Sequence, residues 1–60
     1  MLTLYFCLEE AAPVVRFWPS APRIGDEVAL NEFGIPLEVY QVVWEGHDEA
    51  VVRVYLRQSL

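Results

Sequence analysis

The chain has 60 residues, of which 55% are hydrophobic, and nine acidic residues outnumber four arginines to give a net charge of −5. Nonspecific nucleic-acid binding depends on clustered cations, so this balance argues against a general nucleic-acid binder. One cysteine excludes an intramolecular disulfide. A single domain over residues 1–60 would bury only about 60% of the surface of its unfolded chain. Tight packing and self-association are then the remaining ways to stabilise so small a fold, and the apolar composition favours a homo-oligomer.

The N-terminal segment predicts a strand over residues 2–8. Its apolar side chains fall on alternate positions, which is the period of a strand with one buried face; they are Leu2, Leu4, Phe6 and Leu8. The segment has no positively charged start, as a signal peptide would, and its apolar run is too short to span a bilayer. We therefore expect a cytoplasmic protein with no membrane contact. A prokaryotic or phage origin is a separate expectation.

The middle of the chain predicts two more short strands and a long loop. Residues 14–18 form a second strand after Pro13, which cannot donate to a sheet ladder. Residues 19–25, PSAPRIG, read as an extended loop of the kind that often holds a site. A third strand follows within residues 25–30, with Val28 and Leu30 pointing inward, and residues 31–34 supply the turn that ends it.

The C-terminal part, residues 36–60, predicts a β-hairpin with a four-residue loop at residues 46–49. The facing pairs are then Trp44 with Val51, Val43 with Val52, Val42 with Arg53, Gln41 with Val54, Tyr40 with Tyr55, Val39 with Leu56 and Glu38 with Arg57. This register gathers an aliphatic face for the core, made of Leu37, Val39, Val43, Val52, Val54 and Leu56. Gln41 is the one misfit on that face.

Five short strands without a helix predict an all-β domain, namely a small five-stranded antiparallel barrel or a strongly bent sheet. A closed sheet has the advantage that it leaves no exposed edge. The OB-fold is disfavoured because it normally has a helix between its third and fourth strands, and no helical pattern lies between residues 34 and 36.

The segment PRIGDEVALNEFGIPLEVYQVVW resembles the opening of SH3-like small β-barrels, where a Gly-Asp-x-Val strand, a glycine turn and a valine-rich strand follow one another. The resemblance covers residues 22–57 and concerns the fold alone. Ribosomal and transcription-factor barrels of this kind carry basic residues in the turn that here reads NEFG, so nucleic-acid binding is not implied. The plasmid-borne dihydrofolate reductases also have SH3-like barrels, but their Val-Gln-Ile-Tyr signature is missing, so that activity is not implied either.

The hairpin face opposite the core is the predicted binding surface. It combines aromatic, aliphatic and arginine side chains, the types enriched at interface hot spots: Tyr40, Val42, Trp44, Val51, Arg53, Tyr55 and Arg57, with Trp18 and residues 19–22 as an extension. We expect a non-enzymatic module that binds through this face, to further copies of itself or to an extended peptide of another protein. Self-association is the preferred hypothesis.

Two alternative functions remain open. Paired acids at residues 9–10, 26–27 and 48–49 suggest an acidic inhibitor or nucleic-acid mimic of a mobile genetic element. Arg53 and Arg57, with Tyr40 and Tyr55, suggest weak nucleic-acid binding.

Enzymatic and metal chemistry are not expected. The EGHDE segment, residues 45–49, places one histidine among carboxylates, but it reads better as a solvated loop than as a metal site. Cys7 and His47 are the chain's one cysteine and one histidine, and no third orienting group accompanies them. We therefore predict no catalytic residue, no metal and no cofactor.

Overall fold

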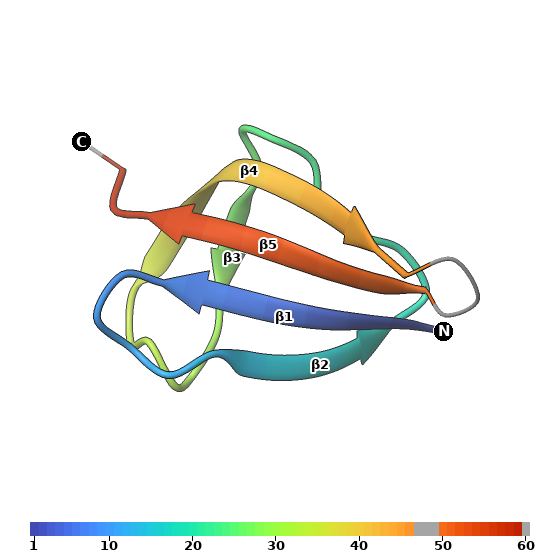
Figure 1. The fold of residues 1–60 in the computed structure, drawn as a ribbon. Coiled ribbons are helices and arrows are strands. Elements are labelled where there is room, and N and C mark those ends of the chain that lie inside the picture. Colours follow the sequence, from blue (N-terminus) through green and yellow to red (C-terminus); the bar gives the residue numbers. More distant parts are fainter. Residues whose placement is uncertain (47–49, 60) are drawn as a thin grey trace.

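The computed structural model describes residues 1–46 and 50–59 and forms a single curled sheet of five strands. The strands are β1 (Leu2–Leu8), β2 (Val14–Trp18), β3 (Glu27–Ala29), β4 (Pro36–Glu45) and β5 (Val51–Arg57), and they lie in the order β2-β1-β5-β4-β3 (Figure 1). The described residues contain no helix, so the all-β prediction is confirmed. Nothing in that part of the chain has the helical length and hydropathy that a membrane crossing requires.

The sheet is mixed, so the prediction of a purely antiparallel sheet is wrong. The first and last strands run parallel at its centre, where the Thr3 N–H donates to the Ala50 carbonyl at 2.8 Å and Leu4 lies beside Val52. The other three pairings, β1 with β2, β3 with β4 and β4 with β5, are antiparallel. Alternation of apolar residues indicates which face of a strand is buried but does not identify its neighbours.

The curled sheet forms a half-barrel, and β2 and β3 are its two edges. Figure 1 shows β3 behind β1 and β5, with β4 arching over to join it. Among the described residues, no backbone hydrogen bond joins β2 to β3. A salt bridge crosses the opening instead, between Arg16 on β2 and Glu32 in the turn after β3, with 2.6 Å between Nη2 and Oε2.

The core fills the concave side of the half-barrel. It consists of the buried aliphatic and aromatic side chains that alternation points inward, namely Leu4, Phe6, Val14, Val28, Leu30, Leu37, Val39, Val52, Val54 and Leu56. Leu2 and Leu8 pack against it from the two ends of β1. The inward assignments for residues 2–8 and for Val28 and Leu30 are therefore confirmed. Each buried side chain of this size contributes about 1.5–3 kcal/mol through the hydrophobic effect.

The hairpin register is confirmed at one end and wrong at the other. Glu38 faces Arg57 and Val39 faces Leu56 as predicted, but a β-bulge follows, so that Gln41 faces Tyr55. Beyond it the pairs are Val42 with Val54, Val43 with Arg53, Trp44 with Val52 and Glu45 with Val51. A bulge inserts one extra residue, here Tyr40, and reverses which side chains point inward.

The bulge also accounts for Gln41. It moves this side chain to the exposed convex face and turns Val42 toward the core, where Val42 packs against the buried residues. Val43, predicted in the core, consequently lies on the convex face beside Arg53. The loop prediction changes with the register, because Glu45 now pairs with Val51; residues 47–49 of the predicted loop lie outside the described residues.

Candidate functional site

The predicted binding residues lie on both faces of the sheet. Tyr40, Val51, Arg53, Tyr55 and Arg57 belong to the convex face, as predicted from the hairpin pattern. The bulge places the remaining hairpin residues, Val42 and Trp44, on the concave side, where Trp44 pairs with the buried Val52. The residues predicted to form one binding surface are therefore divided between two separate surfaces.

The arginines of the convex face are each held between an aromatic ring and a carboxylate. Arg57 lies over the Tyr40 ring at 5.4 Å and its Nε donates to Glu38 at 3.0 Å. Arg53 lies over the Tyr5 ring at 5.3 Å and its Nε donates to Glu45 at 2.9 Å. The hydrogen bond that Arg53 donates to Glu45 is the main cause that raises the pKa of Arg53.

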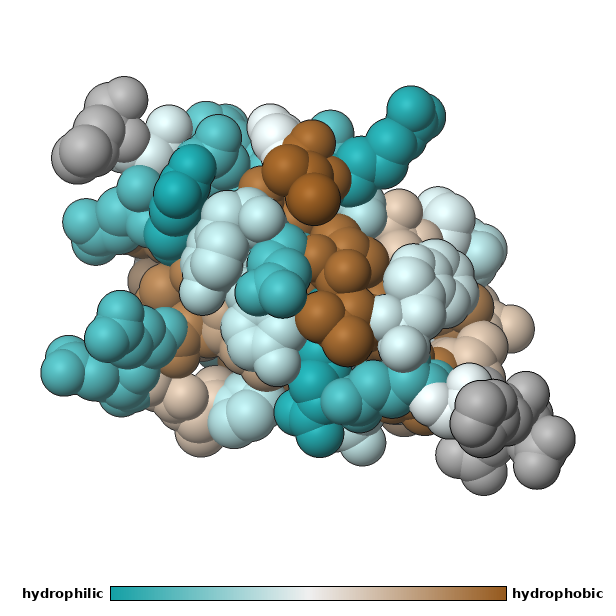
Figure 2. Space-filling model, turned by 45° about the horizontal axis from the view of Figure 1, so that its top comes forward, coloured by the Kyte–Doolittle hydropathy of each residue, from teal (hydrophilic) through white to brown (hydrophobic). Residues whose placement is uncertain are grey.

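This pairing changes what the convex face can do. The rings of Tyr40 and Tyr55 lie 6.3 Å apart, and each nearby arginine already has a carboxylate partner. Each of these two ion pairs carries no net charge, whereas affinity for a phosphate backbone comes from cations that displace its counterions. Figure 2, seen from the side of β4 and β5, shows apolar residues gathered near the middle of this view with hydrophilic residues around them.

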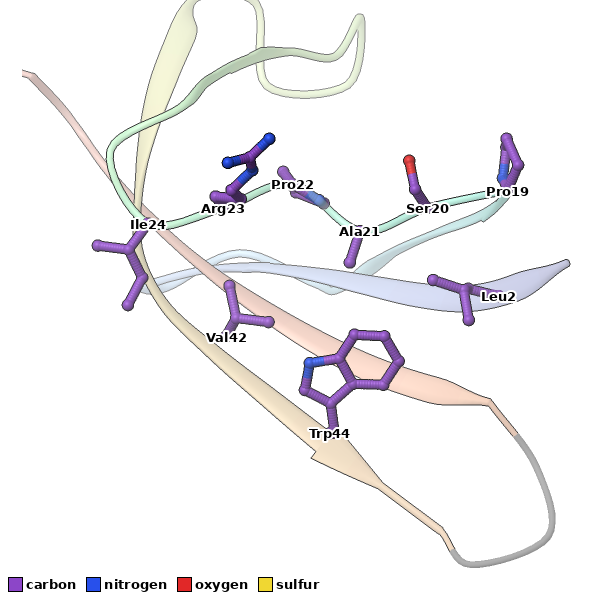
Figure 3. Close-up of a pocket in the computed structure, with 9 residues that line it drawn as sticks. All are labelled: Leu2, Pro19, Ser20, Ala21, Pro22, Arg23, Ile24, Val42 and Trp44. Atoms are coloured by element: carbon purple, nitrogen blue, oxygen red, sulfur yellow. The ribbon is translucent and has the colours of Figure 1, made fainter.

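The second surface is an open groove of about 770 Å³ between the end of β4 and the loop that follows β2. Its lining is mostly apolar: Leu2, Val42, Trp44 and the loop residues Pro19, Ser20, Ala21, Pro22, Arg23 and Ile24. Trp44 is 62% exposed although it points to the concave side. In Figure 3, Val42 and Trp44 rise from β4 toward the loop, Ala21 points back at them, and Ser20 and Arg23 point away.

Gly25 fixes the loop that forms the upper wall of the groove. The Asp26 N–H donates to the Arg23 carbonyl at 3.0 Å, closing a turn in which Gly25 has a φ of 97°. That conformation is the third position of a type II turn, which favours glycine. The Asp26 carboxylate secures the same turn, because it accepts a hydrogen bond from the Arg23 N–H at 2.9 Å.

The turn is attached directly to β4. The Gly25 N–H donates to the Val39 carbonyl at 2.8 Å, and the Val39 N–H donates to the Asp26 carbonyl at 2.9 Å. This is the hydrogen-bond pattern of a β-bulge that begins with glycine. The loop is consequently held at a set position relative to β4, and the two prolines in it restrict its backbone further. Both walls of the groove are thus formed before any ligand binds.

Trp18, predicted as an extension of the binding surface, packs inward. Its ring lies 5.0 Å from that of Phe6, and the side chain is half-buried against the core. Residues 19–22 do line the groove with Trp44 and Val42, whereas Leu2, Arg23 and Ile24 are groove residues that were not among the predicted binding residues. A signal for Leu2 existed, since its alternation with Leu4 points it to the same side as the core.

The sequence raised two possible chemical sites, a metal site in the EGHDE segment and the pair Cys7 and His47. Within residues 1–46 and 50–59, no group of three or more histidine, cysteine or acidic side chains is arranged to hold a metal ion. Cys7 lies half-buried on β1, where its thiol contacts the Tyr5 carbonyl at 3.6 Å. The other half of the pair considered above, His47, and most of the EGHDE segment lie outside the described residues.

Comparisons with protein-family models, with curated proteins and with solved structures gave no match to this chain.

Proposed function

We propose that this chain is a non-enzymatic, SH3-like binding module that holds an extended, proline-rich segment of another polypeptide in the groove beside Trp44. The observation that carries the proposal is the exposure of this tryptophan at 62% over an apolar groove. Large aromatic side chains left accessible in a concave apolar site are typical of interface hot spots. Open apolar patches on small soluble domains also mark interaction sites more often than chance.

The shape and chemistry of the groove favour an extended ligand. The groove is open to solvent rather than enclosed, so it suits a chain lying across it better than a small molecule that would be fully buried. A polyproline II segment has no internal hydrogen bonds, and its carbonyls are free to accept one from the Trp44 indole N–H. Because the segment is stiff before binding, it also loses little conformational entropy.

Charge supports a basic residue in the ligand. The chain as a whole has a net charge of −5, and the one charged residue that the described residues contribute to the groove lining, Arg23, points away from Val42 and Trp44 (Figure 3). Cationic ligands are steered toward such a protein at low ionic strength. We therefore expect arginine or lysine beside the prolines of the bound segment, and an affinity that decreases moderately as salt is added.

Tryptophan fluorescence tests the proposal with a matched pair of variants. In Trp18→Phe the remaining indole is that of Trp44, and in Trp44→Phe it is that of Trp18, which packs on Phe6. A synthetic proline-rich peptide with a terminal arginine should shift the emission of the first variant to shorter wavelength and leave the second unchanged. The control peptide has glycine in place of each proline. Equal responses to both peptides, or none in the Trp18→Phe protein, would refute the proposed function.

A further inference from the structure

The free edge of β2 is a second surface, independent of the groove, and the direction of its backbone groups follows from the sheet. Thr3 directs its N–H toward β5, as its hydrogen bond to Ala50 shows. Successive residues of a strand point their backbone groups to opposite sides, so Leu2, Leu4 and Phe6 direct theirs toward β2. Their partners there are Trp18, Arg16 and Val14.

Val15 and Phe17 therefore direct their N–H and C=O groups away from β1, to the outer edge of the sheet. Among the described residues, the Val15 carbonyl accepts a hydrogen bond from Arg16 Nη1 at 3.0 Å, and no backbone partner is found for the other three groups. Both side chains are also exposed on the convex face, Phe17 to 63%. An apolar edge of this kind is a template for pairing with another strand.

We propose that β2 pairs antiparallel with β2 of a second copy of this chain, centred on Arg16, so that the two half-barrels share one continuous sheet. In this register Val15 of each copy faces Phe17 of the other. The four outward backbone groups of each edge then find partners, because a carbonyl that already binds one donor has a second lone pair. Aromatic and β-branched side chains facing each other across strands add about 0.2–1 kcal/mol per pair.

The prolines that flank β2 select this register. Pro13 and Pro19 occupy the outward positions next to Val15 and Phe17, and neither has an N–H to donate. Centring the pair on Val15 would place Phe17 opposite Pro13, and centring it on Phe17 would place Val15 opposite Pro19. Each shift loses donors that the Arg16-centred pairing keeps. The edge is thus complementary to itself over five residues, and the prolines end the pairing there.

Charge is compatible with a second copy at this edge. The two-fold axis brings one Arg16 near the other, but each is already paired with a Glu32 in two contacts of 2.7 and 2.6 Å. Two such ion pairs in antiparallel arrangement alternate in sign and carry no net charge. The chain also exposes 4338 Å², somewhat more than the roughly 4000 Å² expected for a compact monomer of its 6.9 kDa mass. The contact is short, so we expect a dissociation constant on the order of 100 µM.

Analytical ultracentrifugation at protein concentrations from about 10 µM to 1 mM covers both sides of this dissociation constant. Wild type should pass from monomer to dimer, whereas Phe17→Lys and Val15→Pro should remain monomeric. Val15→Pro removes an outward N–H and no bond to β1, so the fold is retained. Ile35→Lys is the matched control, since it changes charge equally at another exposed apolar residue, 45% accessible, in the connection between β3 and β4. This variant should still dimerise.

Amide hydrogen exchange supplies an internal control within β2. The amides of Val15 and Phe17 should exchange more slowly at high protein concentration, and that of Arg16, which faces β1, should change least. A wild type that stays monomeric at about 1 mM, or dimers that persist in both edge variants, would overturn the inference. Dimers lost in Tyr40→Ser but kept in Phe17→Lys would assign the contact to the convex hairpin face instead. Peptide binding by Phe17→Lys separates this test from that of the groove.

Discussion

Replacing Gly25 by alanine should loosen the groove through backbone strain alone. Gly25 has a φ of 97°, and a Cβ placed there meets no atom within 4 Å, so steric clash plays no part. An L-residue with positive φ is disfavoured by roughly 1–2 kcal/mol. The lower conformational entropy of the unfolded alanine chain offsets about 0.4–1 kcal/mol of this cost. The expected net loss in the free energy of unfolding is about 1 kcal/mol, which lowers Tm by about 4–8 °C in so small a domain.

Peptide binding distinguishes a local effect of Gly25→Ala on the groove from a general loss of stability. Gly34→Ala is the matched control, because Gly34 also has a positive φ, 80°, and a Cβ added there meets no atom within 4 Å. Gly34 is not part of the groove lining. Both variants should melt earlier in a thermal scan followed by circular dichroism. Gly25→Ala alone should weaken peptide binding, while Gly25→Asn should lose less stability since asparagine tolerates this conformation. An unchanged Tm in Gly25→Ala, or equal loss of peptide binding in the two alanine variants, would refute the reasoning.

Two further results are expected. The hydrogen bond from Arg16 is the main cause that lowers the pKa of Glu32. The pair therefore stabilises the fold above the ordinary carboxyl pKa and ceases to do so as pH falls through the lowered pKa. The urea midpoints of wild type and Glu32→Gln should differ at pH 7 and converge in acid, and a difference that stays constant with pH would contradict this. The bulge places Val42 toward the core and Val43 on the convex face. Val42→Thr should therefore lower the free energy of unfolding by about 1 kcal/mol, and Val43→Thr should lower it by clearly less. A larger loss in Val43→Thr than in Val42→Thr, measured by urea titration, would contradict the register.

Much of the fold follows from local pattern. The strand bounds at residues 14–18 agree with the structure because Pro13 and Pro19 end the extended run on both sides. The buried faces of β1 and β3 follow from strict alternation, which leaves one way to bury Leu4 or Val28. The parallel contact of β1 with β5 is different, since it depends on loop paths and on the curl of the whole sheet.

The candidate site was predicted only in part, for a reason that lies in three residues. Val42, Val43 and Trp44 are all apolar, so no alternation shows which of them points inward. The misfit of Gln41 was the one local sign of a bulge, because the predicted register, which has no bulge, put this amide in the core. Once the bulge is placed, Trp44 turns from the convex face to the loop of residues 19–24, and the groove appears.

A titration followed by two-dimensional NMR of the uniformly labelled chain tests the binding proposal most directly. The probe is the proline-rich peptide with a terminal arginine, added to about 1 mM so that weak binding is also detected. The account predicts progressive shifts of the Trp44 indole N–H and of the Ala21 amide on the facing loop, with Arg53 and Tyr55 on the convex face unchanged. Shifts confined to Arg53 and Tyr55, or no shifts at all, would contradict it.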